Sequence, residues 1–145
     1  MPYFTVFTPT YNRAYILPKL YQSLCEQTCK DFEWMIVDDG STDDTGKLVA
    51  QWEGQNNEFD IHYYKIQNGG KPHAINFGIT KANGDFFFMV DSDDRLTTDA
   101  VQKMLLWCKE IEDDPTFVGV GAARGYPDGS YLKGTAPRTN EHGYV

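Results

Sequence analysis

The sequence of 145 residues predicts an α/β fold, with a mostly parallel β-sheet that has helices on its faces. Short runs of β-branched and aromatic residues alternate along the chain with longer segments whose apolar residues recur every three or four positions. The short runs are largely apolar throughout, as in strands that are buried on both faces. With 41% hydrophobic residues the chain can bury one core, so we expect a single domain or part of one.

Each expected strand is a run rich in β-branched or aromatic side chains that ends at turn residues. The first run, YFTVFT, stops at Pro9. The run DFFFMV is apolar almost without interruption, which is typical of the buried middle of a parallel sheet. The expected strands are residues 3–8, 32–37, 61–66, 85–90 and 117–123.

Amphipathic segments separate these strands. In the first of them Pro18 falls near the first turn, where a helix tolerates proline. Ser41 or Thr42 is expected to cap the second. The expected helices are residues 14–27, a segment with Leu48 and Trp52, residues 72–82, and a segment that starts near Thr97 and includes Val101 and Cys108. Because helices alternate with strands, crossovers join the strands and these lie parallel.

Composition and charge exclude several classes of protein. The formal net charge is -8 and the pI is near 4.7, which is the wrong sign for a protein that binds nucleic acid. No apolar run approaches the roughly 18 residues of a membrane span, and the start of the chain lacks a secretion signal, so we expect a cytoplasmic protein. Cys25, Cys29 and Cys108 predict neither a disulfide framework nor a complete metal-ligand set.

Polar stretches follow the first four expected strands where each strand ends. They read TPTYNR, DDGSTDD, QNGGKPH and DSDDR. Each stretch by itself is more often a helix cap or a turn. Since the carboxyl ends of parallel strands share one edge of the sheet, the stretches together predict a ligand site at that edge.

Asp91, Asp93 and Asp94 stand together directly after an apolar run. Carboxylates this close repel one another unless a cation or the amino end of a helix lies nearby. One or two carboxylates are enough to hold Mg²⁺ or Mn²⁺, with the remaining positions left to water or phosphate. The stretch therefore predicts a divalent metal that accompanies a phosphate.

Three further residues suit a nucleotide beside such a metal. Lys71 follows two glycines whose backbone can approach a ligand closely, so it offers a second positive charge to a diphosphate. Tyr11 has a flat face for a base, and Asp39 can accept a hydrogen bond from a ring N–H. The implied ligand is a nucleoside diphosphate.

The stretches FTPTYNR, VDDGSTDDT, NGGKPHAINFGI and ANGDFFFMVDSDD resemble, in this order, the motifs of the family 2 glycosyltransferases, whose nucleotide-sugar-binding fold is called GT-A. The resemblance covers about residues 3–123 and implies a Rossmann-like GT-A sheet that is cut short. It implies that residues 1–123 are the donor-binding domain, the amino-terminal part of a longer enzyme. Residues 124–145, rich in Gly, Pro, Ser and Thr, would begin an acceptor region that is loop-like or disordered.

The resemblance also implies roles for individual residues. In such enzymes the loop after the first strand and the second Asp of the Asp-Asp pair hold the uracil, and the Asp-x-Asp element contacts the ribose and binds the metal. The nucleotide-binding residues implied here are Thr8, Pro9, Tyr11, Arg13, Asp39, Lys71 and Asp91. The implied ligands of Mn²⁺ or Mg²⁺ are Asp93 and Asp94.

The implied reaction transfers a sugar, with inversion, from a nucleoside diphosphate sugar to a hydroxyl of a saccharide or glycolipid acceptor. A UDP-sugar is the expected donor, in polysaccharide or glycoconjugate synthesis, in the cytoplasm or at the inner face of a membrane. The catalytic base of the family lies well downstream of the Asp-x-Asp element. Because Asp128 and Glu141 match no motif of the family, the base is expected beyond residue 145. His73 and His142 are more typical of structural or exposed histidines.

Two other functions stay open at this point. A domain that binds a nucleotide sugar without an acceptor half would not transfer it, and a sheet without its last strands leaves an edge that favours self-association. A phosphatase of the haloacid dehalogenase type also uses Asp-x-Asp after an apolar strand, with the first Asp as nucleophile. That family has the pair near the start of the chain, followed by Thr or Val, whereas here Asp94 and Arg95 follow.

Overall fold

The structure is a computed structural model that describes residues 1–122, 124–126, 128, 130, 139–140 and 143–144. The chain forms two compact units, Met1–Gln102 and Lys103–Val145. His142 and Glu141, which were considered above, lie outside the described residues.

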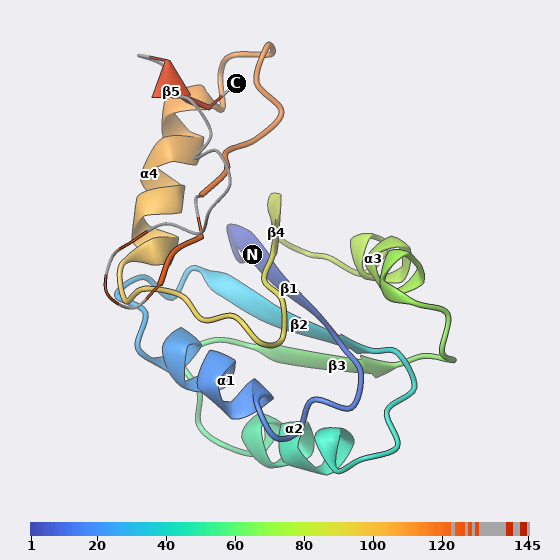
Figure 1. Cartoon of the computed structure of the whole chain (residues 1–145). Coiled ribbons are helices and arrows are strands. Elements are labelled where there is room, and N and C mark those ends of the chain that lie inside the picture. Colours follow the sequence, from blue (N-terminus) through green and yellow to red (C-terminus); the bar gives the residue numbers. More distant parts are fainter. Residues whose placement is uncertain (123, 127, 129, 131–138, 141–142, 145) are drawn as a thin grey trace. The chain divides into compact units, whose positions relative to one another are not determined.

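A parallel sheet of four strands forms the centre of the first unit, in the order β3-β2-β1-β4 (Figure 1). The strands are β1 Phe4–Thr10, β2 Phe32–Asp38, β3 Ile61–Lys65 and β4 Phe86–Met89. Phe4 of β1 pairs with Phe32 on one side and with Phe86 on the other, so β1 is an inner strand. The predicted α/β class with a mostly parallel sheet is confirmed.

Three helices, α1 Leu17–Cys25, α2 Thr45–Glu53 and α3 Lys71–Ile79, cover the two faces of this sheet. The fourth helix is α4 Ala100–Ile111. On one face Trp34 of β2 packs against Tyr21 of α1 and Trp52 of α2, with ring centroids 6.0 and 5.7 Å away. On the other face Phe7, Met35 and Val37 enclose Ala74 of α3 in a fully buried cluster. Alternate residues of β2 thus face opposite helices, as the pleat requires.

A buried charged network joins β1 and β2 to the turn that precedes β4. The Glu33 carboxylate accepts hydrogen bonds from the Thr5 hydroxyl at 2.6 Å and from the backbone and side-chain nitrogens of Asn83, both at 2.8 Å. His62 Nε2 lies 3.2 Å from the same carboxylate. Burial by itself raises the pKa of Glu33, but these hydrogen bonds and the imidazole outweigh it, and the pKa falls below its ordinary value.

The first strand extends beyond its predicted end, because β1 continues through Pro9 to Thr10. Residues in a strand alternate the side to which their backbone groups point. The carbonyl of Phe7 accepts from Val90 on the β4 side, and that of Thr10 accepts from Asp39 on the β2 side. Pro9 therefore faces the β4 side, where the pairing with β1 has already ended at Met89. The missing N–H of the proline costs no ladder bond at this position.

Two other strand predictions are wrong. Among the described strands β4 pairs with β1 alone, so it is an edge and not the middle of the sheet, and Met89 is 46% exposed. Residues 117–122 of the expected fifth strand contain no strand. Val118 is fully exposed there, and Gly119 and Gly121 have no side chains with which to pack.

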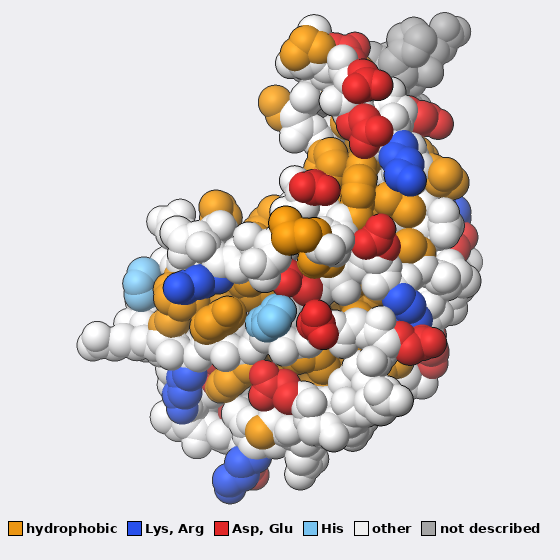
Figure 2. All heavy atoms as spheres, turned by 180° about the vertical axis from the view of Figure 1, so that it is seen from behind, with side chains coloured by type: hydrophobic (Ala, Val, Ile, Leu, Met, Phe, Trp, Pro, Cys, Tyr) orange, Lys and Arg blue, Asp and Glu red, His pale blue; other side chains and the backbone are white. Residues whose placement is uncertain are grey.

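The second unit contains most of α4 and a pair of short strands. These strands, β5 Thr139–Asn140 and β6 Gly143–Tyr144, pair antiparallel within the segment that was expected to be loop-like or disordered. The division into a donor part before residue 124 and an acceptor part after it stays a prediction. No helix in the described part of the chain is both long and apolar enough to cross a membrane. On the face in Figure 2, acidic and basic side chains are interspersed, without a continuous basic patch.

Candidate functional site

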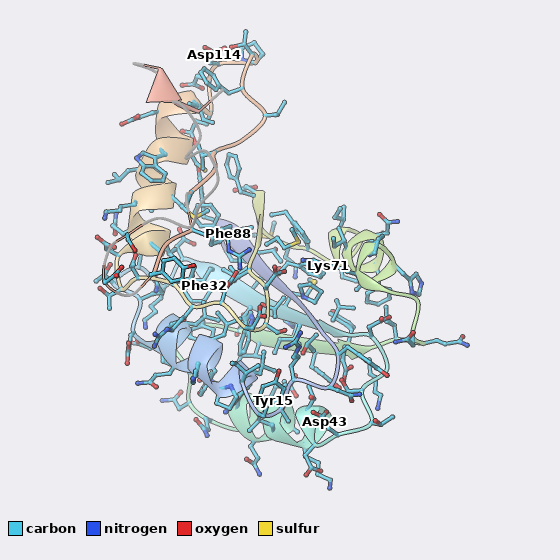
Figure 3. All side chains as sticks on the ribbon, viewed as in Figure 1. Tyr15, Phe32, Asp43, Lys71, Phe88 and Asp114 are labelled. Carbon is cyan, nitrogen blue, oxygen red and sulfur yellow. The ribbon has the colours of Figure 1, made fainter. Side chains whose placement is uncertain are left out.

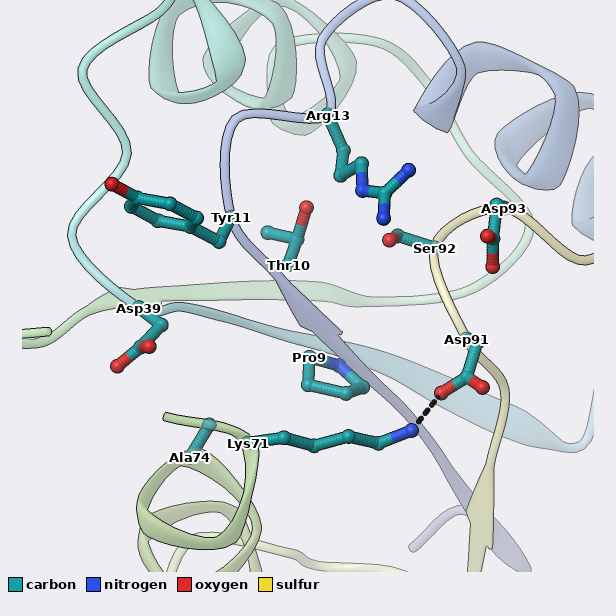
Figure 4. A pocket seen from close by; sticks show the side chains of 10 residues that line it. All are labelled: Pro9, Thr10, Tyr11, Arg13, Asp39, Lys71, Ala74, Asp91, Ser92 and Asp93. Atoms are coloured by element: carbon teal, nitrogen blue, oxygen red, sulfur yellow. Dashed lines mark hydrogen bonds and ion pairs between the residues drawn. The ribbon is translucent and has the colours of Figure 1, made fainter. Parts of the chain in front are cut away.

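A pocket of about 310 Å³ opens at the carboxyl ends of the strands, within the first unit (Figure 4). This volume is at the lower end of the roughly 300–1,000 Å³ that is usual for small-molecule sites. The loops after β1, β2 and β4 and the start of α3 supply its walls. The lining residues are Pro9, Thr10, Tyr11, Arg13, Asp39, Lys71, Ala74, Asp91, Ser92 and Asp93.

Most of the residues singled out in the sequence meet at this pocket. The predicted residues that line it are Pro9, Tyr11, Arg13, Asp39, Lys71, Asp91 and Asp93. Asp94 belongs to the same acidic cluster as Asp91 and Asp93. Thr8 does not line the pocket, because it is fully buried and its hydroxyl accepts a hydrogen bond from Trp34 Nε1 at 3.0 Å. The sequence did not point to Thr10 or Ser92, because nothing in a sequence distinguishes a threonine or serine that contacts a ligand from one that does not.

Asn12 ties the loop after β1 to the loop after β2. Its backbone N–H donates to the Ser41 hydroxyl at 2.8 Å, and its side-chain oxygen accepts from the backbone N–H groups of Thr42 and Asp43 at 2.8 and 3.3 Å. Its φ of 51° lies in the left-handed region, which asparagine tolerates better than most residues. Asn12 was not among the predicted residues, although an Asn after a strand end is a known turn signal.

The cap of α2 differs from the prediction, which named Ser41 or Thr42, because the N-cap residue is Asp44 and its side chain makes no capping hydrogen bond. Asp43, which lies ahead of α2, accepts hydrogen bonds from the backbone N–H and the hydroxyl of Thr45 at 3.1 and 2.6 Å (Figure 3). A second oxygen of Asp43 accepts from the backbone N–H of Ala14 at 3.0 Å. Burial by itself raises the pKa of Asp43, but these donors together outweigh it and the pKa falls below its ordinary value. Ser41 and Thr42 precede Asp44 by three and two residues, and the Ser41 hydroxyl accepts instead from the backbone N–H of Asn12.

The two consecutive aspartates at the end of β2 have different surroundings. Asp38 is fully buried and accepts hydrogen bonds from the backbone N–H of Ser41 at 2.7 Å and from the Tyr63 hydroxyl. Burial, together with this bond, raises the pKa of Tyr63 above its ordinary value of 10.0. Asp38 therefore holds the loop and β3 together, whereas Asp39 reaches the pocket.

The Asp39 carboxylate anchors the glycine loop that precedes α3. Its Oδ1 accepts from the backbone N–H of Gly69 at 2.8 Å. Its Oδ2 accepts from the backbone N–H of Gly70 at 2.8 Å and from the Asn68 amide at 3.2 Å. A carboxylate has about four acceptor positions, so one remains, on Oδ1, for a ligand. Gly70 has a φ of 88°, a conformation that favours glycine.

Lys71 and Asp91 face each other across the pocket. The Lys71 ammonium lies 2.5 Å from Asp91 Oδ1, in an ion pair between the first residue of α3 and the loop after β4 (Figure 4). About half of the Lys71 side chain and a third of the Asp91 side chain are exposed. This ion pair joins the start of α3, which follows the glycine turn, to the loop after β4, which carries the rest of the acidic cluster.

Asp91, Asp93 and Asp94 form an acidic cluster whose ligand oxygens all lie within 4.8 Å of one another. The backbone N–H of Asp94 donates to the Asp91 carbonyl at 3.0 Å, in a turn that brings the three carboxylates to one side. Carboxylate oxygens are the ligands that Mg²⁺ and Mn²⁺ prefer. The chemistry of this donor set fits such an ion.

Thr10 carries a buried hydroxyl that has no hydrogen-bond partner among the described residues. The residue is 3% exposed and lines the pocket. Its neighbour Tyr11, by contrast, exposes 48% of its surface. The pocket thus offers an accessible aromatic ring, a spare acceptor, a buried hydroxyl and an acidic cluster with a lysine, which together suit a ligand with a planar ring and an anionic end.

A model of the family described as glycosyl transferase family 2 matches residues 5–143. The poly(ribitol-phosphate) beta-N-acetylglucosaminyltransferase TarS of Staphylococcus aureus is 32% identical over 139 residues, which cover 92% of this chain and 24% of TarS. The solved structure of S. aureus TarS in complex with UDP-GlcNAc matches with a TM-score of 0.70 and 29% identity, over 77% of this chain and 32% of that one.

A mannosyltransferase of Pyrobaculum calidifontis, solved in complex with GDP-Man and Mn²⁺, has the same fold. It matches with a TM-score of 0.73 and 27% identity, and the match covers 88% of this chain and 37% of that one. This chain therefore spans about a quarter of the length of TarS and about a third of each solved chain.

Proposed function

The chain belongs to glycosyl transferase family 2, and from this membership we propose that its pocket binds a UDP-sugar together with Mn²⁺ or Mg²⁺, for transfer of the sugar to an acceptor hydroxyl. The observation that carries the proposal is the arrangement of the pocket, which has Tyr11 and Asp39 at one side and the cluster of Asp91 and Asp93 at the other.

The side with Tyr11 and Asp39 would receive the base. The half-exposed ring of Tyr11 offers a face for stacking, and Pro9 offers a second apolar surface in the same lining. The acceptor position that remains on Asp39 Oδ1 suits the ring N–H of uracil. TarS has been solved with UDP-GlcNAc, which supports a uridine donor, while the mannosyltransferase binds GDP-Man and makes guanosine the alternative.

The side with the acidic cluster would receive the diphosphate. Asp93 and Asp94 would hold the divalent ion, and Asp91 would contact the nucleotide. The ion, when bound, neutralises negative charge that develops on the departing nucleoside diphosphate. Lys71 carries a positive charge to the same place, since its ammonium already lies beside Asp91.

Transfer would proceed by direct displacement at the anomeric carbon, with inversion, once a base removes the proton of the acceptor hydroxyl. The carboxylates that line the pocket are committed elsewhere. Asp39 is bonded to the glycine loop, Asp91 is paired with Lys71, and Asp93 belongs to the acidic cluster. We therefore assign the base to a residue outside this pocket lining, in the part of the enzyme that binds the acceptor.

The acceptor would be a saccharide or a glycolipid, in polysaccharide or glycoconjugate synthesis. We place the reaction in the cytoplasm, and at the inner face of a membrane where the acceptor is a glycolipid.

Isothermal titration calorimetry with UDP, GDP and ADP, with and without Mn²⁺, tests the proposal. We expect UDP to bind only in the presence of the ion, and Asp93→Ala to abolish this metal-dependent binding. Asp44→Ala is the matched control, because Asp44 is an exposed acid that pairs with Lys47. Equal affinity for UDP with and without Mn²⁺ in the unaltered chain would contradict the metal, and no binding of any nucleotide would contradict the site.

A further inference from the structure

The unpartnered hydroxyl of Thr10 points to a further contact in the pocket. Resting on the proposed function, we propose that Thr10 Oγ1 forms a hydrogen bond with a ribose hydroxyl of the bound nucleotide. Thr10 would then be a specificity residue for the donor, distinct from the base contacts and from the acidic cluster.

The first observation is the state of the hydroxyl in the protein alone. Thr10 is 3% exposed. Among the buried side-chain nitrogen and oxygen atoms of the described residues, its Oγ1 stands out because it has no hydrogen-bond partner. A buried polar atom without a partner loses its hydrogen bonds to water and gains none in return. Folded proteins avoid this state, and the exceptions require an explanation.

The second observation is the contrast with the other threonines of β1. Thr5 and Thr8 are equally buried, yet each has a partner. The Thr5 hydroxyl donates to Glu33 at 2.6 Å and accepts from the backbone N–H of Gly84 at 2.9 Å. The Thr8 hydroxyl accepts from Trp34 Nε1 at 3.0 Å. The strand therefore satisfies its hydroxyls where they face the core, and Thr10 differs by facing a pocket.

The third observation is the place of Thr10 between the two ends of the pocket. Its carbonyl accepts from the backbone N–H of Asp39 at 2.9 Å, which fixes it beside the proposed base end. In Figure 4 Thr10 lies between Tyr11 and Ser92, and its hydroxyl points to the side where Arg13 and Ser92 lie. In a nucleoside diphosphate the ribose connects the base to the phosphates. A ribose hydroxyl can both donate to and accept from a threonine, so it can supply the missing partner.

Three variants separate this role from a structural one. Thr10→Val removes the hydroxyl at nearly constant shape, and Thr10→Ser keeps it. Thr5→Val is the matched control, because it removes a buried but partnered hydroxyl from the same strand. For each variant we would measure the melting temperature without ligand and the Kd for UDP with Mn²⁺. The Kd would also be measured for 2′-deoxy-UDP and 3′-deoxy-UDP.

We expect Thr10→Val to raise the Kd for UDP about fivefold, as for the loss of one hydrogen bond, while the melting temperature stays equal or rises. Thr10→Ser should recover most of the affinity. Thr5→Val should lower the melting temperature and leave the Kd unchanged. The fivefold effect of Thr10→Val should disappear with the deoxy analogue that lacks the partner hydroxyl.

Unchanged UDP affinity in Thr10→Val would overturn this inference alone, provided that the unaltered chain binds UDP. An equal effect of Thr10→Val on UDP and on both deoxy analogues would overturn the assignment to the ribose. If the unaltered chain binds neither UDP nor GDP in the presence of Mn²⁺, the proposed function itself fails and this inference fails with it.

Discussion

At the scale of single residues, Asp39 both holds the glycine loop and lines the pocket. Its carboxylate accepts three hydrogen bonds from residues 68–70, and it also lines the pocket at the proposed base end. The glycine loop that carries Lys71 therefore depends on a side chain that the ligand would also use. A substitution at this position should affect both the loop and the binding of the nucleotide.

We predict that Asp39→Asn weakens UDP binding and lowers the melting temperature. An asparagine presents one oxygen and one NH₂ group, so one of the two backbone amides that Asp39 now accepts from would lose its partner. The affinity should fall by about 1–3 kcal/mol, as for an unpaired buried polar group. Titration calorimetry and thermal unfolding measure the two effects, with the exposed Asp60→Asn as control. An unchanged Kd together with an unchanged melting temperature would remove Asp39 from both roles.

The residues of the pocket were largely predictable, because each predicted residue is chemically unusual for its place at a strand end. Neighbouring carboxylates, a lysine after two glycines and an aromatic residue in a turn can all be recognised in the sequence itself. The contacts of Asp39 were not, since its partners lie 29 to 31 residues away. Thr10 was missed for a different reason. A threonine at the end of a strand is ordinary, and only its burial without a partner makes it noticeable.

At the scale of elements, the connection between α3 and β4 is held by the charged network around Glu33. Asn83 and Gly84 in this connection bond to Glu33 and Thr5, which lie on different strands. The connection therefore fixes where β4 begins, and β4 in turn carries the acidic cluster at its far end. Two predictions follow from this position.

The first concerns pH. The folded-state pKa of Glu33 lies below its ordinary value of 4.5, so its carboxylate stabilises the fold at pH values above about 4.5. This contribution is lost as the pH falls from 4.5 through the lowered folded-state pKa. We predict that the free energy of unfolding falls less between pH 7 and pH 3.5 in Glu33→Gln than in the unaltered chain. Denaturant titrations at both pH values test this, and equal losses would exclude the network as a source of acid sensitivity.

The second concerns Gly84, where the backbones of two elements nearly touch. A Cβ at this position would lie 2.3 Å from the backbone nitrogen of Thr5, closer than any real contact, and backbone cannot move aside as a side chain can. We predict that Gly84→Ala destabilises the protein by at least about 2 kcal/mol, because β1 and the turn must separate. Gly54→Ala is the matched control, since its nearest contacts are 3.6 Å away. Similar melting temperatures for the two variants would show that the turn can relax.

At the scale of the whole molecule, the alternation of helix and strand patterns was enough to predict the class, the order of the elements and the edge that carries the site. Local patterns do not show which strands become neighbours. The run DFFFMV is apolar enough for an inner strand, but its position depends on whether another strand pairs with it. Residues 117–122 were expected to be a strand from their composition alone, and the described structure has no strand there.

We predict that this chain binds a nucleotide but does not transfer a sugar. The three carboxylates of the pocket lining hold the glycine loop, pair with Lys71 or belong to the proposed metal site, which leaves none for the acceptor proton. A coupled assay for UDP release, run with a panel of UDP-sugars and saccharide acceptors and beside a reaction with water alone, measures the transfer. Acceptor-dependent turnover at about 1 per second or faster, as in ordinary enzymes, would mean that the base lies within these 145 residues.

The ion pair between Lys71 and Asp91 also has a thermodynamic consequence. Asp91 lies beside Asp93 and Asp94, so the charge of a divalent ion held by those two residues would weaken the pairing of the Asp91 carboxylate with the Lys71 ammonium. An ammonium released in this way is available to a diphosphate. Metal and nucleotide would then bind with positive heterotropic coupling, and this coupling is reciprocal because it is a property of the ternary complex. The free concentration of the ion would set the apparent affinity for the nucleotide, and the nucleotide would retain the ion by the same factor.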